Sequence, residues 1–359
     1  MNQTTVTCTK AYLKKLLLSL RIRSGHLPEH QIFNKNTCHL TSFFAFEKCS
    51  VEKCFLDNNI SNLISLSIMS LKIIVLAKQV PDTRNVGKDA MKADGTVNRA
   101  ALPAIFNPED LNALEQALQL KEQYPGSTVS LLTMGPPRAA DIIREGLFRG
   151  ADGGVLLTDR AFAGADTLAT SYALACAVKK MKDYDIIIGG RQAIDGDTAQ
   201  VGPQVAEKLG LPQITYAEKI LKVQDGKIQV KRRLERGVEV VEAKYPVVIT
   251  VNGSADDCRP RNAKLIQRYK YAKTISERQN QDNDYFSNLY ENRPYLNLTE
   301  WSVSDVDADL DQVGLAGSPT KVKQIENVVF QAKESKKLSG NDTEIDELMK
   351  ELIVNHTIG

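Results

Sequence analysis

Residues 184–203 (YDIIIGGRQAIDGDTAQVGP) group the residue types best suited to hold a charged ligand. The isoleucines at 186–188 predict a strand that is buried on both faces. Gly189 and Gly190 follow this strand, and glycines there let the backbone approach a ligand closely. The residues DGDT at 195–198 predict a turn and a helix from about Thr198, whose amides would face a phosphate or pyrophosphate. An ordinary strand–turn–helix corner would show the same pattern, so the residues alone leave both readings open.

The rest of the chain offers few groups that could catalyse a reaction unaided. Residues 69–355 contain no histidine, and only Cys176 and Cys258 of the six cysteines lie there. This excludes Ser/His and Cys/His dyads and most zinc sites from that part of the chain. Cys49 and Cys54 lack a second pair at zinc-finger spacing. Any chemistry of the main part is therefore expected to come from a bound cofactor.

Composition narrows the class of protein. Of 359 residues, 42% are hydrophobic and 25% are charged, as in soluble globular proteins. The formal net charge of +2 gives no reason to propose a nucleic acid or a membrane surface as a partner. No apolar run approaches the length that a bilayer-spanning helix requires.

The elements that must position the 184–203 stretch alternate between strand and helix. Strands are predicted at 71–77, 128–133, 155–158 and 186–188. Asn107 is expected to cap a helix that begins at Pro108, Asp166 and Thr167 to cap a second, and Gly210 to end a third. The pattern predicts an α/β fold with a mostly parallel, doubly wound sheet of the Rossmann-like, adenine nucleotide α-hydrolase-like type.

Beyond residue 215 the pattern becomes antiparallel. Strands at 216–223 and 227–233 are joined by Asp225 and Gly226, which signal a hairpin, and a further strand is expected at 246–251. We also expect a small hairpin at 92–99 around Asp94 and Gly95. The strands at 216–223 and 227–233 would form a small antiparallel addition to the parallel sheet.

The two ends of the chain differ from the α/β part. Residues 1–68 show no clear period, and we expect them to be a non-native or disordered extension before Met69; a targeting segment is the other reading. Residues 69–273 are expected to form one domain that binds a nucleotide or FAD. Residues 274–300 read as a linker, followed by a strand-like stretch at 322–332 and an amphipathic helix at 344–354. An arm without its own core, at 274–359, is expected to pack on another chain.

Motifs spread over this chain carry a family resemblance. They are KQVPDT at 78–83, NPED at 107–110, MGPP at 134–137, DRAFAGADT at 159–167, GRQAIDGDTAQVGP at 190–203, and VKR at 230–232 with Glu235, Gly237, Glu239 and Pro246. From Met69 to about Ala332 the chain resembles the β subunit of an electron transfer flavoprotein. The first 68 residues lie outside the resemblance.

The resemblance implies a cytoplasmic heterodimer with a flavoprotein α subunit, on which the C-terminal arm would pack. The α-subunit FAD exchanges electrons with dehydrogenases, typically those that act on acyl-CoA. The β subunit holds AMP in ordinary members of the family. In electron-bifurcating members it holds a second FAD, which takes a hydride from NADH.

The segments AFAGADT, VPDT and DGDTAQVGP resemble the bifurcating bacterial members, so FAD is the expected β-site cofactor and AMP the alternative. The chain would then be an electron carrier subunit that oxidises NADH only through the FAD bound to it. Asp166, Thr167 and Thr170 would contact the FAD pyrophosphate, which AMP lacks. Arg191 is expected near the charged part of the dinucleotide, with a structural salt bridge as the other reading. The cofactor-binding residues that the resemblance implies are Leu76, Ala77, Lys78, Asn107, Asp110, Met134, Asp166, Thr167, Thr170, Gly190, Arg191, Gln192, Ala193, Ile194, Asp195, Gly196, Asp197, Thr198, Ala199, Gln200 and Val201.

A second implied contact lies further along the chain. Arg261, Ala263, Lys264 and Leu265 correspond to the segment that anchors the β subunit to its dehydrogenase. A leucine with basic neighbours is typical of an interface hot spot, although Asn262 replaces a common aromatic residue there. A basic solvated helix face is the plainer reading of the same residues.

Three alternative functions differ in how well they match the sequence. A non-bifurcating carrier would hold structural AMP in the same site. An adenylate-using enzyme is disfavoured because neither SGGxDS nor GxxxxGK[ST] occurs. A nucleotide-binding interaction protein without a redox role would share the fold and the site.

Overall fold

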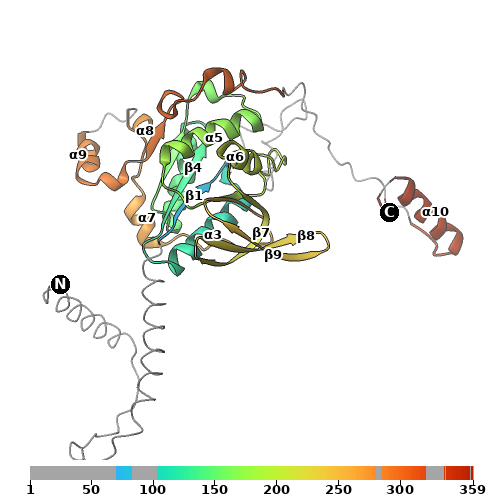
Figure 1. Ribbon diagram of the computed structural model, residues 1–359. Helices are drawn as coiled ribbons and strands as arrows, with labels where there is room; N and C mark the ends of the chain where they lie inside the picture. The colour runs from blue at the N-terminus through green and yellow to red at the C-terminus, as the bar shows by residue number, and fades with distance from the viewer. Residues whose placement is uncertain are drawn as a thin grey trace, which may run out of the picture. The chain divides into compact units, whose positions relative to one another are not determined.

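Figure 1 shows the computed structural model, which describes residues 70–82, 103–279, 284–320, 335, 337–355 and 357–358. The expected N-terminal extension at 1–68, the hairpin at 92–99 and the strand at 322–332 lie outside the described residues. No helix in the described part of the chain is long and apolar enough to cross a membrane.

One nine-stranded sheet organises the main part, in the order β11-β5-β4-β1-β6-β10-β7-β8-β9. Neighbouring strands are parallel from β11 to β7, and β8 and β9 extend the sheet in antiparallel fashion. The strands are β1 Lys72–Leu76, β4 Thr128–Met134, β5 Gly153–Leu157, β6 Ile186–Gly190, β7 Gln213–Gln224, β8 Lys227–Leu234, β9 Gly237–Lys244, β10 Val247–Val251 and β11 Thr299–Trp301. The predicted α/β class with a mostly parallel sheet is confirmed.

The sheet is covered on both faces because its central strands are apolar on both sides. In β1, Ile73 and Val75 pack with helix α3 (Pro108–Gln123), while Ile74 packs on the opposite side with helix α5 (Thr167–Met181). Helices α4 (Ala140–Arg149) and α6 (Val201–Leu209) complete the covering layers (Figure 1). Alternate residues of each buried strand thus serve opposite cores, which is the doubly wound arrangement.

The chain changes direction at β1. From β1 it moves outward to β4 and β5, and then returns to place β6 on the other side of β1. Strand order in an open parallel sheet reverses at such a point, and a crevice forms there at the carboxyl ends of the strands. The GG-containing stretch of the sequence therefore stands at the switch point, directly after β6.

The antiparallel addition is larger than the predicted hairpin. Strand β9 pairs with β8 along its length, and a separate two-stranded sheet joins β2 (Gln79–Pro81) to β3 (Ala104–Phe106). Strand β9 is not predicted from the sequence, since its side chains are mostly exposed at the open edge of the sheet and no buried apolar face marks it.

Where the pattern predicts a linker at 274–300, the described residues contain regular structure. They include α8 (Ile275–Gln279), α9 (Asp284–Asn292) and β11, which pairs with β5; α7 (Ala263–Tyr269) precedes them. Tyr290, Leu296 and Leu298 are buried in a core with α4, which explains the order despite the polar composition.

The C-terminal helix is confirmed as α10 (Asp342–Val354). Asn341 caps it by accepting a hydrogen bond from the amide of Glu344. Its apolar residues Ile345, Met349 and Ile353 are exposed and recur on one face. The expectation that this arm packs on another chain stays a prediction.

Candidate functional site

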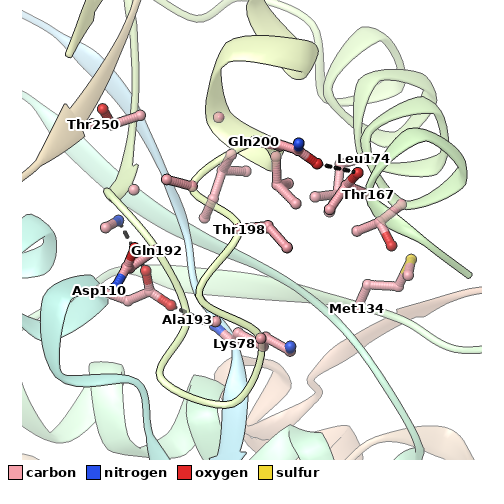
Figure 2. Close-up of a pocket in the computed structure, with 18 of the residues that line it drawn as sticks. Lys78, Asp110, Met134, Thr167, Leu174, Gln192, Ala193, Thr198, Gln200 and Thr250 are labelled. Atoms are coloured by element: carbon pink, nitrogen blue, oxygen red, sulfur yellow. Dashed lines mark hydrogen bonds between the residues drawn. The ribbon is translucent and has the colours of Figure 1, made fainter. Parts of the chain in front are cut away.

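A pocket of about 640 Å³ opens at the switch point between β1 and β6. Its walls come from the ends of both strands, the β6–α6 loop and the start of α5 (Figure 2). This volume lies within the range of about 300–1,000 Å³ that is typical of small-molecule sites.

Asp110 joins the two strand ends beneath the pocket. One carboxylate oxygen accepts a hydrogen bond of 2.8 Å from the amide of Lys78, just after β1. The other accepts one of 2.8 Å from the amide of Gly190, at the end of β6. Burial raises the pKa of Asp110 to about 7, while the two amide donors act in the opposite direction. The carboxyl group thus fixes the spacing between the strands on which the site is built.

Asn107 and Glu109 hold the β6–α6 loop from below. The Asn107 side chain donates to the carbonyl of Gln192 at 2.9 Å and accepts from the amide of Ile194 at 3.2 Å. Glu109 accepts from the amide of Gln192 at 2.9 Å. Asn107 does precede α3, but its side chain makes no capping bond, so the predicted cap is wrong in that respect. The loop takes these hydrogen bonds instead.

Lys78 and Asp195 make a further tie between β1 and the loop. The Lys78 ammonium lies 2.7 Å from an Asp195 oxygen, and its side chain is 48% exposed. Lys78 also lines the pocket, whereas Asp195 does not. The pair therefore places a cation at the pocket wall and leaves part of it open to an incoming anion.

Substituting Lys78 by glutamine is expected to weaken binding of an anionic nucleotide by about tenfold, because one charge-assisted contact is lost. The unfolding free energy should change by less than about 1 kcal/mol, since the Lys78 end of the ion pair is about half exposed to solvent. Isothermal titration with AMP and chemical denaturation of the same samples would check both numbers. The variant Asp195→Asn is the matched control: it breaks the ion pair but keeps the cation, so nucleotide affinity should be retained.

The last part of the loop presents a row of backbone donors. Within the described residues, the amides of residues 198–202 donate no hydrogen bond to the protein, and all five residues line the pocket. Ala199 has φ +53°, an uncommon left-handed conformation for alanine that bends this row. Successive amides at a bend before a helix form an anion-binding concavity. This donor set fits a phosphate group.

The same segment corrects the predicted start of the helix. Helix α6 begins at Val201 rather than near Thr198, and its first flanking residue is Gln200, whose side chain makes no capping bond. Gln200 instead accepts a hydrogen bond of 2.8 Å from the Thr167 hydroxyl across the pocket (Figure 2). Leaving the helix start without a side-chain cap keeps its amides available to a ligand.

The opposite wall begins at α5. The Asp166 carboxylate caps this helix by accepting hydrogen bonds from the amides of Leu168 and Ala169, as predicted. Its other oxygen accepts from the amide of Thr320 at 3.1 Å and from the Thr320 hydroxyl. Burial would raise the pKa of Asp166, but these hydrogen bonds lower it overall. Residue 320, far along the chain, thereby becomes part of the pocket wall.

Most residues expected at the site line the pocket, and three do not. Asn107 supports the β6–α6 loop, and Ile194 and Asp195 belong to that loop without lining the pocket. The lining residues among those expected are Leu76, Ala77, Lys78, Asp110, Met134, Asp166, Thr167, Thr170, Gly190, Arg191, Gln192, Ala193, Gly196, Asp197, Thr198, Ala199, Gln200 and Val201.

Sequence reasoning missed the apolar part of the pocket and some of its rim. The missed lining residues are Leu132, Phe162, Gly164, Ala165, Leu174, Gly189, Gly202, Val248, Ile249, Thr250 and Thr320. Strand residues such as Leu132 and Val248 look like ordinary core positions in the sequence. Gly189 and Gly202 lie in the 184–203 stretch, and Phe162, Gly164 and Ala165 lie in the DRAFAGADT motif, so these five gave a signal that could have identified them.

Arg191 makes the structural salt bridge of one reading, and its contact with a dinucleotide stays a prediction. Its guanidinium pairs with Glu109 at 3.1 Å and lies 5.7 Å from the Tyr216 ring centre, so it has a structural role. It also lines the pocket. Burial would lower the pKa of Arg191, but the hydrogen bonds that Arg191 donates to Glu109 raise it overall.

The expected partner segment lies away from this pocket, before and within α7. Arg261, Ala263 and Lys264 are exposed, and Arg261 lies 3.5 Å from Glu145. Leu265 is partly buried against the core beside α4. Among the described residues, no group of His, Cys, Asp and Glu side chains could hold a metal ion.

Comparison with known proteins decides the family. Residues 94–274 match the model of the electron transfer flavoprotein domain. The chain belongs to the electron transfer flavoprotein family. The resemblance drawn from the motifs is thereby confirmed, and electron transfer is the function of this family.

Relatives of this electron transfer flavoprotein chain include a subunit beta and subunits of two CoA-reductase systems. It is 43% identical over 281 residues to the electron transfer flavoprotein subunit beta of Clostridium acetobutylicum, covering 78% of this chain and 94% of the relative. It is 42% identical to the caffeyl-CoA reductase–Etf complex subunit CarD of Acetobacterium woodii, covering 70% and 86%. It is also 42% identical to the acryloyl-CoA reductase electron transfer subunit gamma of Anaerotignum propionicum, covering 80% and 100%.

Proposed function

We propose that this chain is the β subunit of a heterodimeric electron transfer flavoprotein of the electron-bifurcating type, and that its pocket holds FAD. The α subunit would carry a second FAD and deliver electrons to an acyl-CoA dehydrogenase or reductase. Relatives named as subunits of caffeyl-CoA and acryloyl-CoA reductase systems support this assignment. Bound FAD would accept a hydride from NADH, chemistry that the side chains of residues 69–355 do not supply by themselves.

The observation that carries the proposal is the pairing of two polar walls in one pocket. The free amides of residues 198–202 suit one phosphate, and the start of α5 at Thr167 and Thr170 offers polar groups opposite. Leu132, Met134 and Phe162 provide apolar surface on which an aromatic ring could pack. AMP has one phosphate and would use only one of the polar walls, whereas a dinucleotide would reach both.

The double variant Thr167→Val, Thr170→Ala separates the two cofactors. We expect it to lower retention of FAD in the β site about tenfold, because polar contacts to the second phosphate are lost. Retention of AMP should stay within about twofold, since its phosphate would lie at the amides of residues 198–202. Equilibrium dialysis with each nucleotide, on the complex with the α subunit, gives both values. Equal losses for AMP and FAD would contradict the assignment of α5 to the dinucleotide.

The direct test is a count of nucleotides in the co-purified heterodimer. The proposal expects two FAD molecules per heterodimer, no AMP, and bleaching of the flavin absorbance by NADH. One FAD with one AMP, and no response to NADH, would reject bifurcation and favour the carrier with structural AMP. A colourless complex would reject a redox role for the pair.

We further propose that Arg261, Ala263, Lys264 and Leu265 contact the dehydrogenase partner. The exposure of the first three residues and the basic character of this segment support the proposal. Because Leu265 is partly packed inside its own subunit, we expect it to position α7 as well as to contact the partner.

A further inference from the structure

Residues 313–320, called the strap here, lie against the 159–166 loop at the wall of the pocket. Gly314 faces the loop with φ +56°, and a Cβ there would stand 2.0 Å from a backbone carbonyl oxygen of the loop. Gly164 in turn faces the strap, where a Cβ would stand 2.7 Å from the side chain of Leu315. Glycine in each segment thus makes room for the other segment. The close fit fixes the strap beside the pocket.

Asp166 binds the strap through both its backbone and its side chain. Its amide donates a hydrogen bond of 2.8 Å to the hydroxyl of Ser318, and this buried hydroxyl donates one of 2.6 Å to the carbonyl of Gly314. One oxygen of the Asp166 carboxylate caps α5, and the other accepts from the amide and the hydroxyl of Thr320. The carboxylate therefore accepts four hydrogen bonds from the protein, two at each oxygen.

The position of this carboxylate matters because it is an anion in a pocket that suits phosphates. Asp166 lines the pocket beside Thr167, and an aspartate is ionised at neutral pH. A phosphate in the same pocket would be repelled by a carboxylate oxygen that faced it. The four hydrogen bonds instead direct both oxygens toward α5 and the strap. Loss of the bonds from Thr320 would leave one oxygen free to turn toward a ligand.

We propose that the strap retains the nucleotide in the pocket, with Thr320 as the positioning residue that holds the Asp166 carboxylate away from a phosphate of the ligand. The inference rests on the proposed function, which puts a dinucleotide in this pocket, and deepens it by naming what keeps the second phosphate beside α5. Thr320 acts on the ligand through Asp166, because its amide and its hydroxyl are both bound to that carboxylate.

The test measures the loss of FAD from the intact αβ complex. The complex is saturated with FAD and then gel-filtered after timed intervals, and the remaining flavin is extracted and counted; the FAD of the α subunit gives a constant reference. Thr320→Val removes the hydroxyl and keeps the size of the side chain. We expect FAD to leave the β site about fivefold faster, because the carboxylate loses a donor that restrains it. Thr320→Ser keeps the hydroxyl and should lie within about twofold of the wild type.

A second pair of variants tests whether Thr320 acts through the charge. Asp166→Asn removes the charge that Thr320 restrains, so Thr320→Val added to it should speed the loss of FAD by less than about twofold. Thr299→Val, at an exposed position of β11, is the matched control and should leave the rate unchanged. An undiminished effect of Thr320→Val beside Asp166→Asn would show that Thr320 merely completes the wall, and would overturn the inference.

The flavin count of the wild type separates the two ways of failing. Two FAD molecules per wild-type heterodimer, with the same rate of loss for Thr320→Val as for the wild type or for Thr320→Ser, would overturn the inference alone. A wild-type complex that holds only the FAD of the α subunit would refute the proposed function, and this inference with it.

Discussion

Replacing Gly190 with alanine is expected to abolish nucleotide retention and to lower the unfolding free energy by about 3 kcal/mol. A Cβ at this position would lie 2.5 Å from an Asp110 carboxylate oxygen, 2.7 Å from the carbonyl carbon of Glu109 and 2.8 Å from the amide nitrogen of Asp110. Two of these atoms are backbone, so the conflict cannot be relieved by turning a side chain. The end of β6 must move away from α3, and the loop that follows it moves with it.

The same loop provides the control for this prediction. Gly196 also lines the pocket, but a Cβ there would meet nothing within 4 Å. The unfolding free energy of Gly196→Ala should therefore lie within about 0.5 kcal/mol of the wild-type value. Thermal unfolding and nucleotide extraction of both variants give the comparison. Equal behaviour of the two variants would show that close packing at the end of β6 does not support the site.

Replacing Asp110 with alanine is expected to lower the unfolding free energy by about 2–4 kcal/mol and to reduce nucleotide affinity at least tenfold. The change leaves the amides of Lys78 and Gly190 without an acceptor beneath the pocket, and an unsatisfied buried donor costs about 1–3 kcal/mol. Asp110→Asn keeps one acceptor oxygen, so it should lower the unfolding free energy by about half as much as Asp110→Ala. Urea unfolding of the three proteins would measure the series.

The pH dependence of this series has a definite sign. Burial raises the pKa of Asp110 from 3.8 to about 7 in the folded protein. A raised pKa means that the stability from this group is complete below pH 3.8 and is lost as the pH rises through about 7. The difference in unfolding free energy between the wild type and Asp110→Asn should therefore shrink from pH 5 to pH 8. A difference that grows over this range would show that the two amide donors outweigh burial.

Sequence reasoning located the pocket because its main signal is local. The run of isoleucines, the glycine pair and the polar turn are consecutive, and their physics requires no distant contact. The helix start at Asp166 was equally local, since a carboxylate followed by an apolar stripe is a cap. Strand and helix alternation then predicted the parallel sheet that brings these two segments to one edge.

The wrong or missing predictions concern side chains whose hydrogen-bond partners are set by the tertiary fold. Asn107 reads as a helix cap, yet its amide group satisfies two polar groups of the β6–α6 loop, whose position depends on the tertiary fold. Thr198 likewise reads as a cap, but α6 starts at Val201 and leaves its amides uncapped. Thr320 could not be found at all, because only the folded chain brings it to Asp166. Local propensity does not report contacts between residues so far apart in the chain.

The regular structure within residues 274–279 and 284–300 also depends on contacts between distant residues. Their polar composition resembles a linker, but Tyr290, Leu296 and Leu298 are spaced to bury three side chains against α4. A few well-placed apolar residues, together with the backbone bonds of Lys273, compensate for the surrounding polarity. Such sparse anchors are not visible as a period in the sequence.

The central claim is that an adenine nucleotide binds at the switch point, with a phosphate at the start of α6. A crystal structure of the αβ complex prepared with FAD tests this most directly. We predict nucleotide density between the β6–α6 loop and α5, with phosphate oxygens within hydrogen-bond distance of the amides of residues 198–202. A clear nucleotide elsewhere on the subunit, with this pocket empty, would contradict the account.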